Sequence, residues 1–199
     1  MKIYRAVVAT LAFLCLLVAI YYIHVQYFRV NVVFYSAVHD GMLAAGLAAV
    51  MLILFPFFKI FNGFEKILLI LMWLITGYAM AISGPAVIDR SLSFYILEKI
   101  QQRGGGIKQE KLAQVFTDEY LKEHRLVDVR LTEQLESGTI VVNDGCVLLT
   151  PKGERFASFG QYFRKNWLPK HRLLLDTYTD DLTDPFRLTS QTIPDYQCR

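Results

Sequence analysis

The residues best placed for chemistry stand where long apolar runs begin and end. His39 and Asp40 come directly before the apolar run of residues 41–58, and Asp89 and Arg90 follow the run of residues 67–83. A His–Asp pair inside a membrane is a candidate for binding a ligand or moving a proton. A guanidinium can hold a lipid phosphate with two parallel hydrogen bonds, and Asp89 would fix the rotamer of Arg90. Two predicted crossings separate the pairs, so we expect all four residues at one membrane face.

Both pairs also have ordinary structural explanations. Asp40 would cap the N-terminus of a helix that begins with the second apolar run. Asp89 and Arg90 would form an ion pair at the membrane surface, where such pairs add little stability.

No established catalytic motif accompanies these residues. The sequence has no GxSxG, HExxH or P-loop pattern, and Gly104–Gly106 is not followed by the Lys-Ser/Thr pair of a phosphate loop. Cys15, Cys146 and Cys198 form no CxxC pair and the histidines are scattered, so we predict no metal site and no cofactor. A Cys146–Cys198 disulfide would require an oxidising compartment. Enzymatic activity is therefore not the favoured prediction.

Three apolar runs dominate the first half of the chain. They cover residues 6–23, 41–58 and 67–83, and each is about as long as a helix that crosses a ~30 Å hydrocarbon core. Lys2 and Arg5 precede the first run, but no small-residue cleavage site follows it, so we interpret it as an uncleaved anchor. We predict a helical membrane protein with three transmembrane helices in residues 1–88. Residues 24–40 are expected to lie at the interface or to form a re-entrant segment.

The second predicted helix has small residues at helical spacing. They are Gly41, Ala45, Ala48 and Ala49. Such a face lets two helix backbones approach closely in lipid, although alanine can also simply fill a helix.

The polar half changes periodicity. Amphipathic spacing predicts helices near residues 90–103, 108–124 and 127–138, each followed by glycine or a charged turn. The segments TIVV and CVLL flank Asn143-Asp144-Gly145, which is a strong hairpin signal, and residues 152–168 return to a helical pattern. The predicted order is three helices, a hairpin and a helix.

The segment LESGTIVVNDGCVLLTPKGERF, residues 135–156, carries a family resemblance. It resembles winged-helix regulators of the MarR and PadR type, which often carry a similar L-x-x-G-x-I … L-T-x-K-G run. The resemblance covers about residues 90–168 and implies a small α+β winged-helix-like domain at residues 89–172, followed by a tail at residues 173–199. In that family the third helix enters the DNA major groove.

The predicted third helix is poorly suited to DNA. Asp128, Glu133 and Glu136 outnumber Arg130 on it, and carboxylates repel the phosphate backbone. Nucleic acid is therefore not an expected partner, and a protein partner fits the domain better.

Cations and aromatics gather at the end of the last predicted helix. We predict a membrane-surface patch of Arg164, Lys165, Trp167, Lys170 and Arg172, because this mixture suits an anionic lipid surface. Alternatively, the aromatic residues of this helix fill the core of the domain.

Three crossings place the predicted polar domain opposite the N-terminus. Lysines and arginines near the membrane do not decide the orientation, because four lie on each side. They are Lys2, Arg5, Lys59 and Lys66 on one side and Arg29, Arg90, Lys99 and Arg103 on the other. We expect a cytoplasmic C-terminal domain, because winged helices are mostly intracellular and the cations of residues 164–172 suit an anionic leaflet.

The leading functional hypothesis is an accessory or scaffolding subunit of a bacterial inner-membrane complex. It would contact membrane lipid, pack against a membrane protein and dock a protein partner through the winged-helix-like domain. The alternatives are a membrane-tethered transcription regulator and a small membrane enzyme acting on a lipid-linked substrate.

Overall fold

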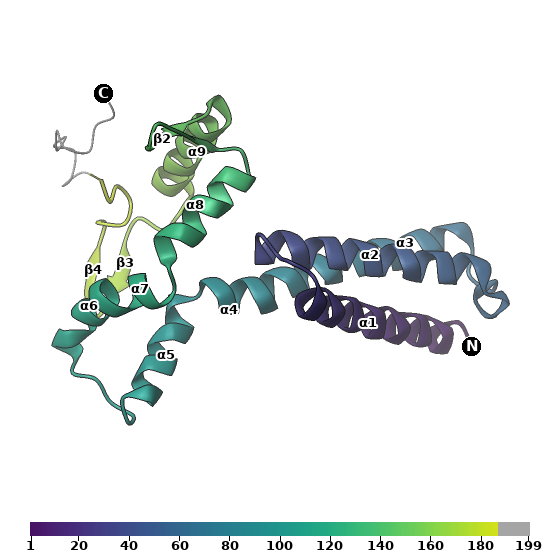
Figure 1. Cartoon of the computed structure of the whole chain (residues 1–199). Helices are drawn as coiled ribbons and strands as arrows, with labels where there is room; N and C mark the ends of the chain where they lie inside the picture. The colour runs from purple at the N-terminus through teal and green to yellow at the C-terminus, as the bar shows by residue number, and fades with distance from the viewer. Residues whose placement is uncertain (187–199) are drawn as a thin grey trace. The chain divides into compact units, whose positions relative to one another are not determined.

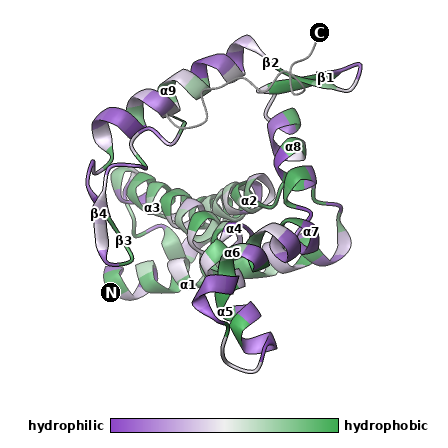
Figure 2. Cartoon of the chain, turned by 90° about the vertical axis from the view of Figure 1, so that its left-hand side faces the viewer, coloured by the Kyte–Doolittle hydropathy of each residue, from purple (hydrophilic) through white to green (hydrophobic). Residues whose placement is uncertain are grey.

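A computed structural model of the chain describes residues 1–186 and divides it into two compact units after Asp128. The first unit contains a bundle of three helices, each long and apolar enough to cross a membrane. Figure 1 shows these helices side by side, and Figure 2 shows that they are mostly hydrophobic along their length. Their bounds are α1 Lys2–Tyr27, α2 Val33–Leu54 and α3 Gly63–Ala81, with a short 3-10 turn, η1, at Pro56–Phe58.

The bundle differs from the sequence prediction at one end. Residues 24–40 do not form a separate interfacial segment, because α1 continues to Tyr27 and α2 already begins at Val33. The third helix also extends beyond the predicted run of residues 67–83 and continues through Pro85. A π-helical turn, η2 (Ile82–Ala86), accommodates its missing N–H, and α4 (Val87–Arg90) completes a continuous span.

The interior of the bundle is built around Trp73. Its ring stacks on Phe13 with centroids 5.5 Å apart, and its Nε1–H donates to Thr10 Oγ1 at 3.2 Å. The predicted small-residue face of α2 is buried at Gly41, Ala45 and Ala48, whereas Ala49 is only half-buried. This face allows α2 and α3 to touch through their backbones: a Cβ added to Gly77 of α3 would lie 3.0 Å from the Cα of Gly41.

Polar contacts join the helices at the end of the bundle that lies away from residues 24–40. Lys2 forms an ion pair with Glu65 at 2.8 Å, and Arg5 donates to the carbonyl of Phe57 at 2.7 Å. Asn62 and Glu65 form a reciprocal capping box at the start of α3. These contacts connect the start of α1 to the turn between α2 and α3.

A polar helical segment completes the first unit. Its elements are α5 Leu92–Gln102, η3 Gln109–Lys111, α6 Leu112–Val115, η4 Phe116–Tyr120 and α7 Leu121–Glu123. Aromatic packing joins them, with the rings of Tyr95 and Tyr120 4.5 Å apart and His124 edge-on to Tyr95.

The second unit begins within the next helix and contains two hairpins. Its elements are α8 Leu126–Glu136, β1 Ile140–Asn143, β2 Cys146–Leu149, α9 Pro151–Trp167, β3 Arg172–Leu174 and β4 Thr177–Thr179. The β1–β2 hairpin is confirmed, and its turn has Asp144 and Gly145 at φ 49° and 79°. The β3–β4 hairpin lies where the sequence predicted only a tail.

The helices, hairpin and final helix follow the predicted order, but they do not form one compact domain. The α5–α7 segment belongs to the first unit, whereas β1, β2 and α9 belong to the second. The winged-helix resemblance therefore stays a prediction.

The Leu-Thr-Pro-Lys-Gly segment has a structural role in the second unit. Thr150 Oγ1 accepts from the N–H of Gly153 at 3.1 Å and donates to the carbonyl of Gly138 at 2.8 Å. Lys152 donates to the carbonyl of Ser137, just beyond the end of α8. The start of α9 is thereby joined to the chain that links α8 to β1.

Candidate functional site: a buried His–Asp pair in the membrane bundle

Asp40 lies inside α2 and is not a helix cap. It sits at the end of the second helical turn, is 3% exposed, and its Oδ1 lies 2.6 Å from Nδ1 of His24 on α1. The other carboxylate oxygen, Oδ2, is buried and has no hydrogen-bond partner among the residues that the structure describes. The N-cap explanation is wrong, because α2 begins well before the apolar run.

The pair that forms is His24–Asp40, not His39–Asp40. His39 is exposed, as expected for the residue that precedes an inward-facing Asp40 on a helix. His24 was not predicted as the partner of Asp40, because sixteen residues separate the two in the sequence. A usable signal was present: His24 lies near the end of the first apolar helix, and His39 and Asp40 lie near the start of the second, so both helices carry ionisable residues close to their shared connection.

A cavity of about 520 Å³ lies beside the pair. Its walls are mostly apolar, and the polar residues among them are His24, His39 and Asp40. The lining residues are Ile20, Ile23, His24, Phe28, His39, Asp40 and Leu43. All of them come from α1, α2 and the connection between these helices.

The geometry gives the imidazole a defined role. A carboxylate next to Nδ1 favours the tautomer that carries its proton on Nδ1, so that Nε2 becomes a hydrogen-bond acceptor. The Phe28 ring lies edge-on to His24, with centroids 5.7 Å apart, and restricts its rotation. The arrangement provides an oriented acceptor, or a proton-accepting base, beside an apolar cavity.

Asp89 and Arg90 lie at the same end of the bundle as the buried pair. The Arg90 guanidinium carbon is 5.7 Å from the centre of the Phe34 ring at the start of α2. Tyr21 of α1 lies within electrostatic range of both Asp40 and Asp89. The structure therefore brings α1, α2 and α4 together here, and phosphate binding by Arg90 stays a prediction.

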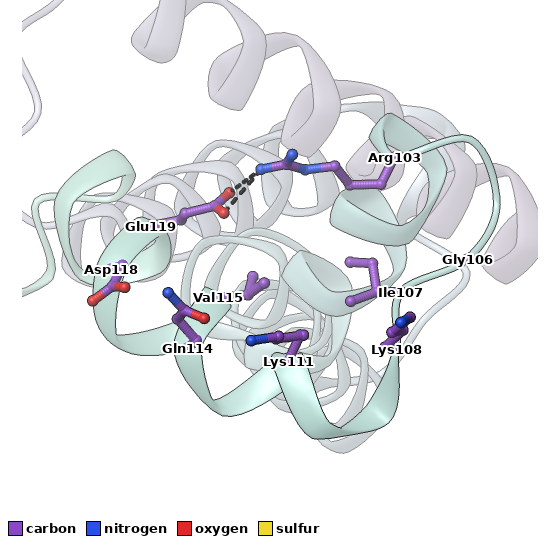
Figure 3. Close-up of a pocket in the computed structure, with 9 residues that line it drawn as sticks. All are labelled: Arg103, Gly106, Ile107, Lys108, Lys111, Gln114, Val115, Asp118 and Glu119. Carbon is purple, nitrogen blue, oxygen red and sulfur yellow. Dashed lines mark hydrogen bonds and ion pairs between the residues drawn. The ribbon is translucent and has the colours of Figure 1, made fainter.

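A second polar cluster, in the α5–α7 segment, was not predicted. Lys99 is buried and donates to Glu119 and Glu123, each at 2.7 Å, and Tyr95 donates to Glu123 at 3.0 Å. Arg103 holds Glu119 with two bonds of 2.9 Å, which Figure 3 shows at the rim of a cavity of about 450 Å³. Lys99 and Arg103 had been regarded only as cations near a membrane surface.

These ion pairs shift the titration of the carboxylates. Hydrogen bonding to Lys99 lowers the pKa of Glu119 and of Glu123 below the ordinary value of 4.5, with Arg103 and Tyr95 as further donors. The same pairs raise the pKa of Lys99, because they favour its charged form. A depressed carboxylate pKa stabilises the fold above the unfolded-state value, and this stability is lost as pH falls through the folded-state value.

We therefore expect Lys99→Gln to raise the pKa of Glu119 and Glu123 towards 4.5, because their strongest hydrogen-bond donor is lost. NMR titration of carboxyl-labelled glutamates in the full chain measures this shift. The α5–α7 segment should also lose stability on acidification below about pH 4.5 in the wild type. Lys122→Gln, which removes a neighbouring exposed cation, is the control. Equal titration curves for the two variants would contradict the assignment.

The predicted membrane-surface patch lies on exposed parts of the second unit. Arg164 and Lys165 are in the last turn of α9, Trp167 ends that helix and is 69% exposed, and Lys170 and Arg172 follow it. The alternative that the aromatic residues fill a core is wrong for Phe156 and Phe159, which are 60% and 61% exposed. Membrane binding by the patch stays a prediction.

Two of the three cysteines lie within the described residues, and their states differ. Cys146 is disulfide-bonded, Cys15 is free, and Cys198 lies outside the described residues. Within residues 1–186, no group of three His, Cys, Asp or Glu side chains is placed to hold a metal ion.

Comparison of the chain with protein-family models, with curated proteins and with solved structures found no match.

Proposed function

We propose that this chain is an accessory or scaffolding subunit of a bacterial inner-membrane complex. Its three apolar helices would anchor it, and its second unit would dock a protein partner. The carrying observation is that the second unit leaves two apolar surfaces exposed: the two-stranded β1–β2 hairpin and an aromatic face of α9, whose one buried residue is Gly153. That face consists of Phe156, Phe159, Phe163 and Trp167. A large exposed apolar patch on a folded unit marks an interaction surface.

The two exposed surfaces of the second unit suit different partners. The aromatic face of α9 adjoins the cations of the membrane-surface patch, which favours an anionic lipid surface. The β1–β2 hairpin forms a sheet of only two strands and exposes Val141, Val142 and Val147. Open strand edges with apolar side chains can take an added strand from another protein. We therefore assign lipid to α9 and the protein partner to the hairpin.

Site-specific photo-crosslinking in cells tests this assignment. A photoreactive phenylalanine at position 142 should give one discrete protein adduct, whereas the same residue at position 159 should give lipid adducts. Position 161 is the control, because it lies on the opposite face of α9 by helical spacing. A protein adduct from position 159 and none from position 142 would reverse the assignment. Absence of both protein adducts would exclude the scaffold function.

The ion pairs of α8 argue against the regulator alternative. Arg125 pairs with Asp128 at 2.8 Å, and Arg130 pairs with Glu133 at 2.7 Å. Cations already held by carboxylates three residues away in the sequence offer little to a phosphate backbone.

The disulfide bears on orientation. Lysines and arginines near the membrane are equal in number on the two sides. The expected cytoplasmic placement therefore relied partly on the usual intracellular location of winged-helix domains. Disulfides persist in oxidising compartments and are rare in the cytosol. With Cys146 disulfide-bonded, we propose the opposite orientation, with the second unit on the periplasmic side and the N-terminus in the cytoplasm.

Thiol labelling measures the orientation. In a Cys15→Ser background, Cys146 in intact cells should resist alkylation until a reductant is added, and then react with a membrane-impermeant maleimide. A Cys146→Ser variant shows which signal belongs to this residue. Reaction of Cys146 without reductant, and only after the membrane is opened, would restore the cytoplasmic placement.

A small membrane enzyme acting on a lipid-linked substrate is the second candidate function. One observation favours it: the His24–Asp40 pair places a proton-accepting imidazole beside an apolar cavity. In this candidate His24 takes the role that the sequence suggested for His39.

A further inference from the structure

The geometry points to a ligand site in the membrane bundle. We infer that the cavity beside His24 binds a membrane-dissolved compound with an apolar body and one hydroxyl group, and that this hydroxyl donates to Nε2 of His24. This site is independent of the docking surfaces of the second unit.

The first step is the state of the imidazole. Asp40 is almost fully buried and contacts Nδ1 at 2.6 Å, so the ring nitrogen left for a ligand is Nε2. The His24 side chain is 26% exposed and lines the cavity, which makes it the accessible member of the pair. With the proton on Nδ1, Nε2 accepts hydrogen bonds and cannot donate them. The ligand must therefore supply a donor.

The second step is the shape and polarity of the cavity. Its volume of about 520 Å³ is within the usual size range of small-molecule sites. Ile20, Ile23 and Leu43 supply apolar walls. These walls match a ring or a short length of hydrocarbon chain, and they disfavour a highly charged head group, which would lose its hydration there.

The third step is the unpaired oxygen of Asp40. A buried carboxylate oxygen without a donor is unfavourable, and it is especially so within a membrane-spanning segment. Burial of Asp40 in this state orients the His24 ring and adds nothing evident to packing. An apolar residue of similar size would fill the position at less cost, so the aspartate is better explained by a ligand-binding role than by stability.

Two kinds of membrane compound share the required chemistry. A hydroquinone offers a phenolic hydroxyl on a ring, and a long-chain or glycerol-based alcohol offers an aliphatic hydroxyl on a chain. Both place one donor on an apolar body, so the experiment needs one probe of each kind.

Photoaffinity labelling of the purified full-length protein in phospholipid nanodiscs tests the site. One probe is a long-chain alcohol carrying a diazirine and an alkyne, and the other is a reduced hydroquinone carrying the same groups. Labelling should fall within residues 20–43. An unlabelled alcohol or hydroquinone should compete, whereas its methyl ether, which has no donor, should not. The probe that labels this segment identifies the source of the ligand.

Variants separate the hydrogen bond from the cavity. His24→Phe keeps a ring but removes Nε2, and should weaken binding about tenfold, the value of one hydrogen bond of ~1.4 kcal/mol. His171→Phe is the matched control, because it makes the same exchange at an exposed histidine of the second unit that does not line the cavity. It should bind as the wild type does.

Three results would overturn the inference: no labelling of residues 20–43 by either probe, equal competition by the methyl ether, or unchanged binding by His24→Phe. If thermal unfolding shows that His24→Phe is misfolded, Leu43→Trp provides the second test. It fills the cavity without altering the pair and should abolish labelling, and persistent labelling would overturn the inference.

Discussion

Gly153→Ala is expected to disrupt the second unit, although it adds a single methyl group to a helix. A Cβ at this position would overlap the carbonyl oxygen of Thr139 and lie 2.9 Å from its carbonyl carbon. Both atoms belong to the backbone, which cannot turn aside as a side chain can. The Thr139 carbonyl also accepts from the backbone N–H of Thr150 at 3.1 Å. If the carbonyl moves to relieve the overlap, this hydrogen bond, which connects the start of β1 to the start of α9, is lost. We expect a loss of about 3 kcal/mol or more.

Hydrogen exchange of the full-length protein in detergent measures this effect. A loss of 3 kcal/mol corresponds to roughly 100-fold faster opening of the amides in residues 138–153. Gly160→Ala is the matched control, because it lies in the same helix with no atom within 4 Å of the added Cβ. It should be neutral or stabilising by up to ~1 kcal/mol, since alanine favours helix. Equal protection in the two variants would show that α9 does not pack on Thr139.

The three long apolar helices could be predicted, because the capacity to span a membrane depends mainly on length and apolar composition. Their ends could not. Proline inside a helix usually ends it, but the π-helical turn at Ile82–Ala86 accommodates Pro85, and the helix continues to Arg90. The start of α2 at Val33 was not predicted, because residues 24–40 as a whole are too polar to span a membrane and were therefore treated as one separate segment.

The candidate site was predicted in part. Asp40 was named as a candidate residue, and the structure pairs it with a histidine that was not predicted, because pairing between two helices depends on their rotation and offset. Sequence spacing within one helix says nothing of either quantity. The same reason explains Lys99: amphipathic spacing predicted its helix, but not that Glu119 and Glu123 would both reach its ammonium group.

The two hairpins show where turn signals succeed and fail. Asp144-Gly145 is a strong turn signal, since glycine adopts a positive φ readily, and β1–β2 was predicted. The turn between β3 and β4 places Leu175 at φ 54°, a conformation that leucine seldom adopts. Asp176 is the only turn-favouring residue there, with no glycine, asparagine or proline beside it, so the sequence suggested only a tail.

Gly77→Val should separate α2 from α3 and thereby disturb the His24–Asp40 pair. Even a single Cβ at Gly77 would lie 3.0 Å from the Cα of Gly41, and the two further methyl groups of valine have no space between the backbones. Gly41 follows Asp40 directly, so a shift of α2 at this point moves the carboxylate away from His24. Close packing of small residues is the main source of helix association in lipid, and we expect a loss of about 2 kcal/mol or more.

Fluorescence of Trp73 reports this change, because its ring is fully buried in the bundle and stacks on Phe13. In a Trp167→Phe background, thermal unfolding of Gly77→Val in detergent should begin at a lower temperature than that of the parent. Gly46→Val is the control: it adds the same side chain to α2 at a position with no atom within 4 Å of its Cβ. Ligand labelling at residues 20–43 should fall with Gly77→Val and persist with Gly46→Val. If both valine variants unfold like the parent, α2 and α3 do not meet at Gly41 and Gly77, and the depth of Asp40 in the bundle must be reassigned.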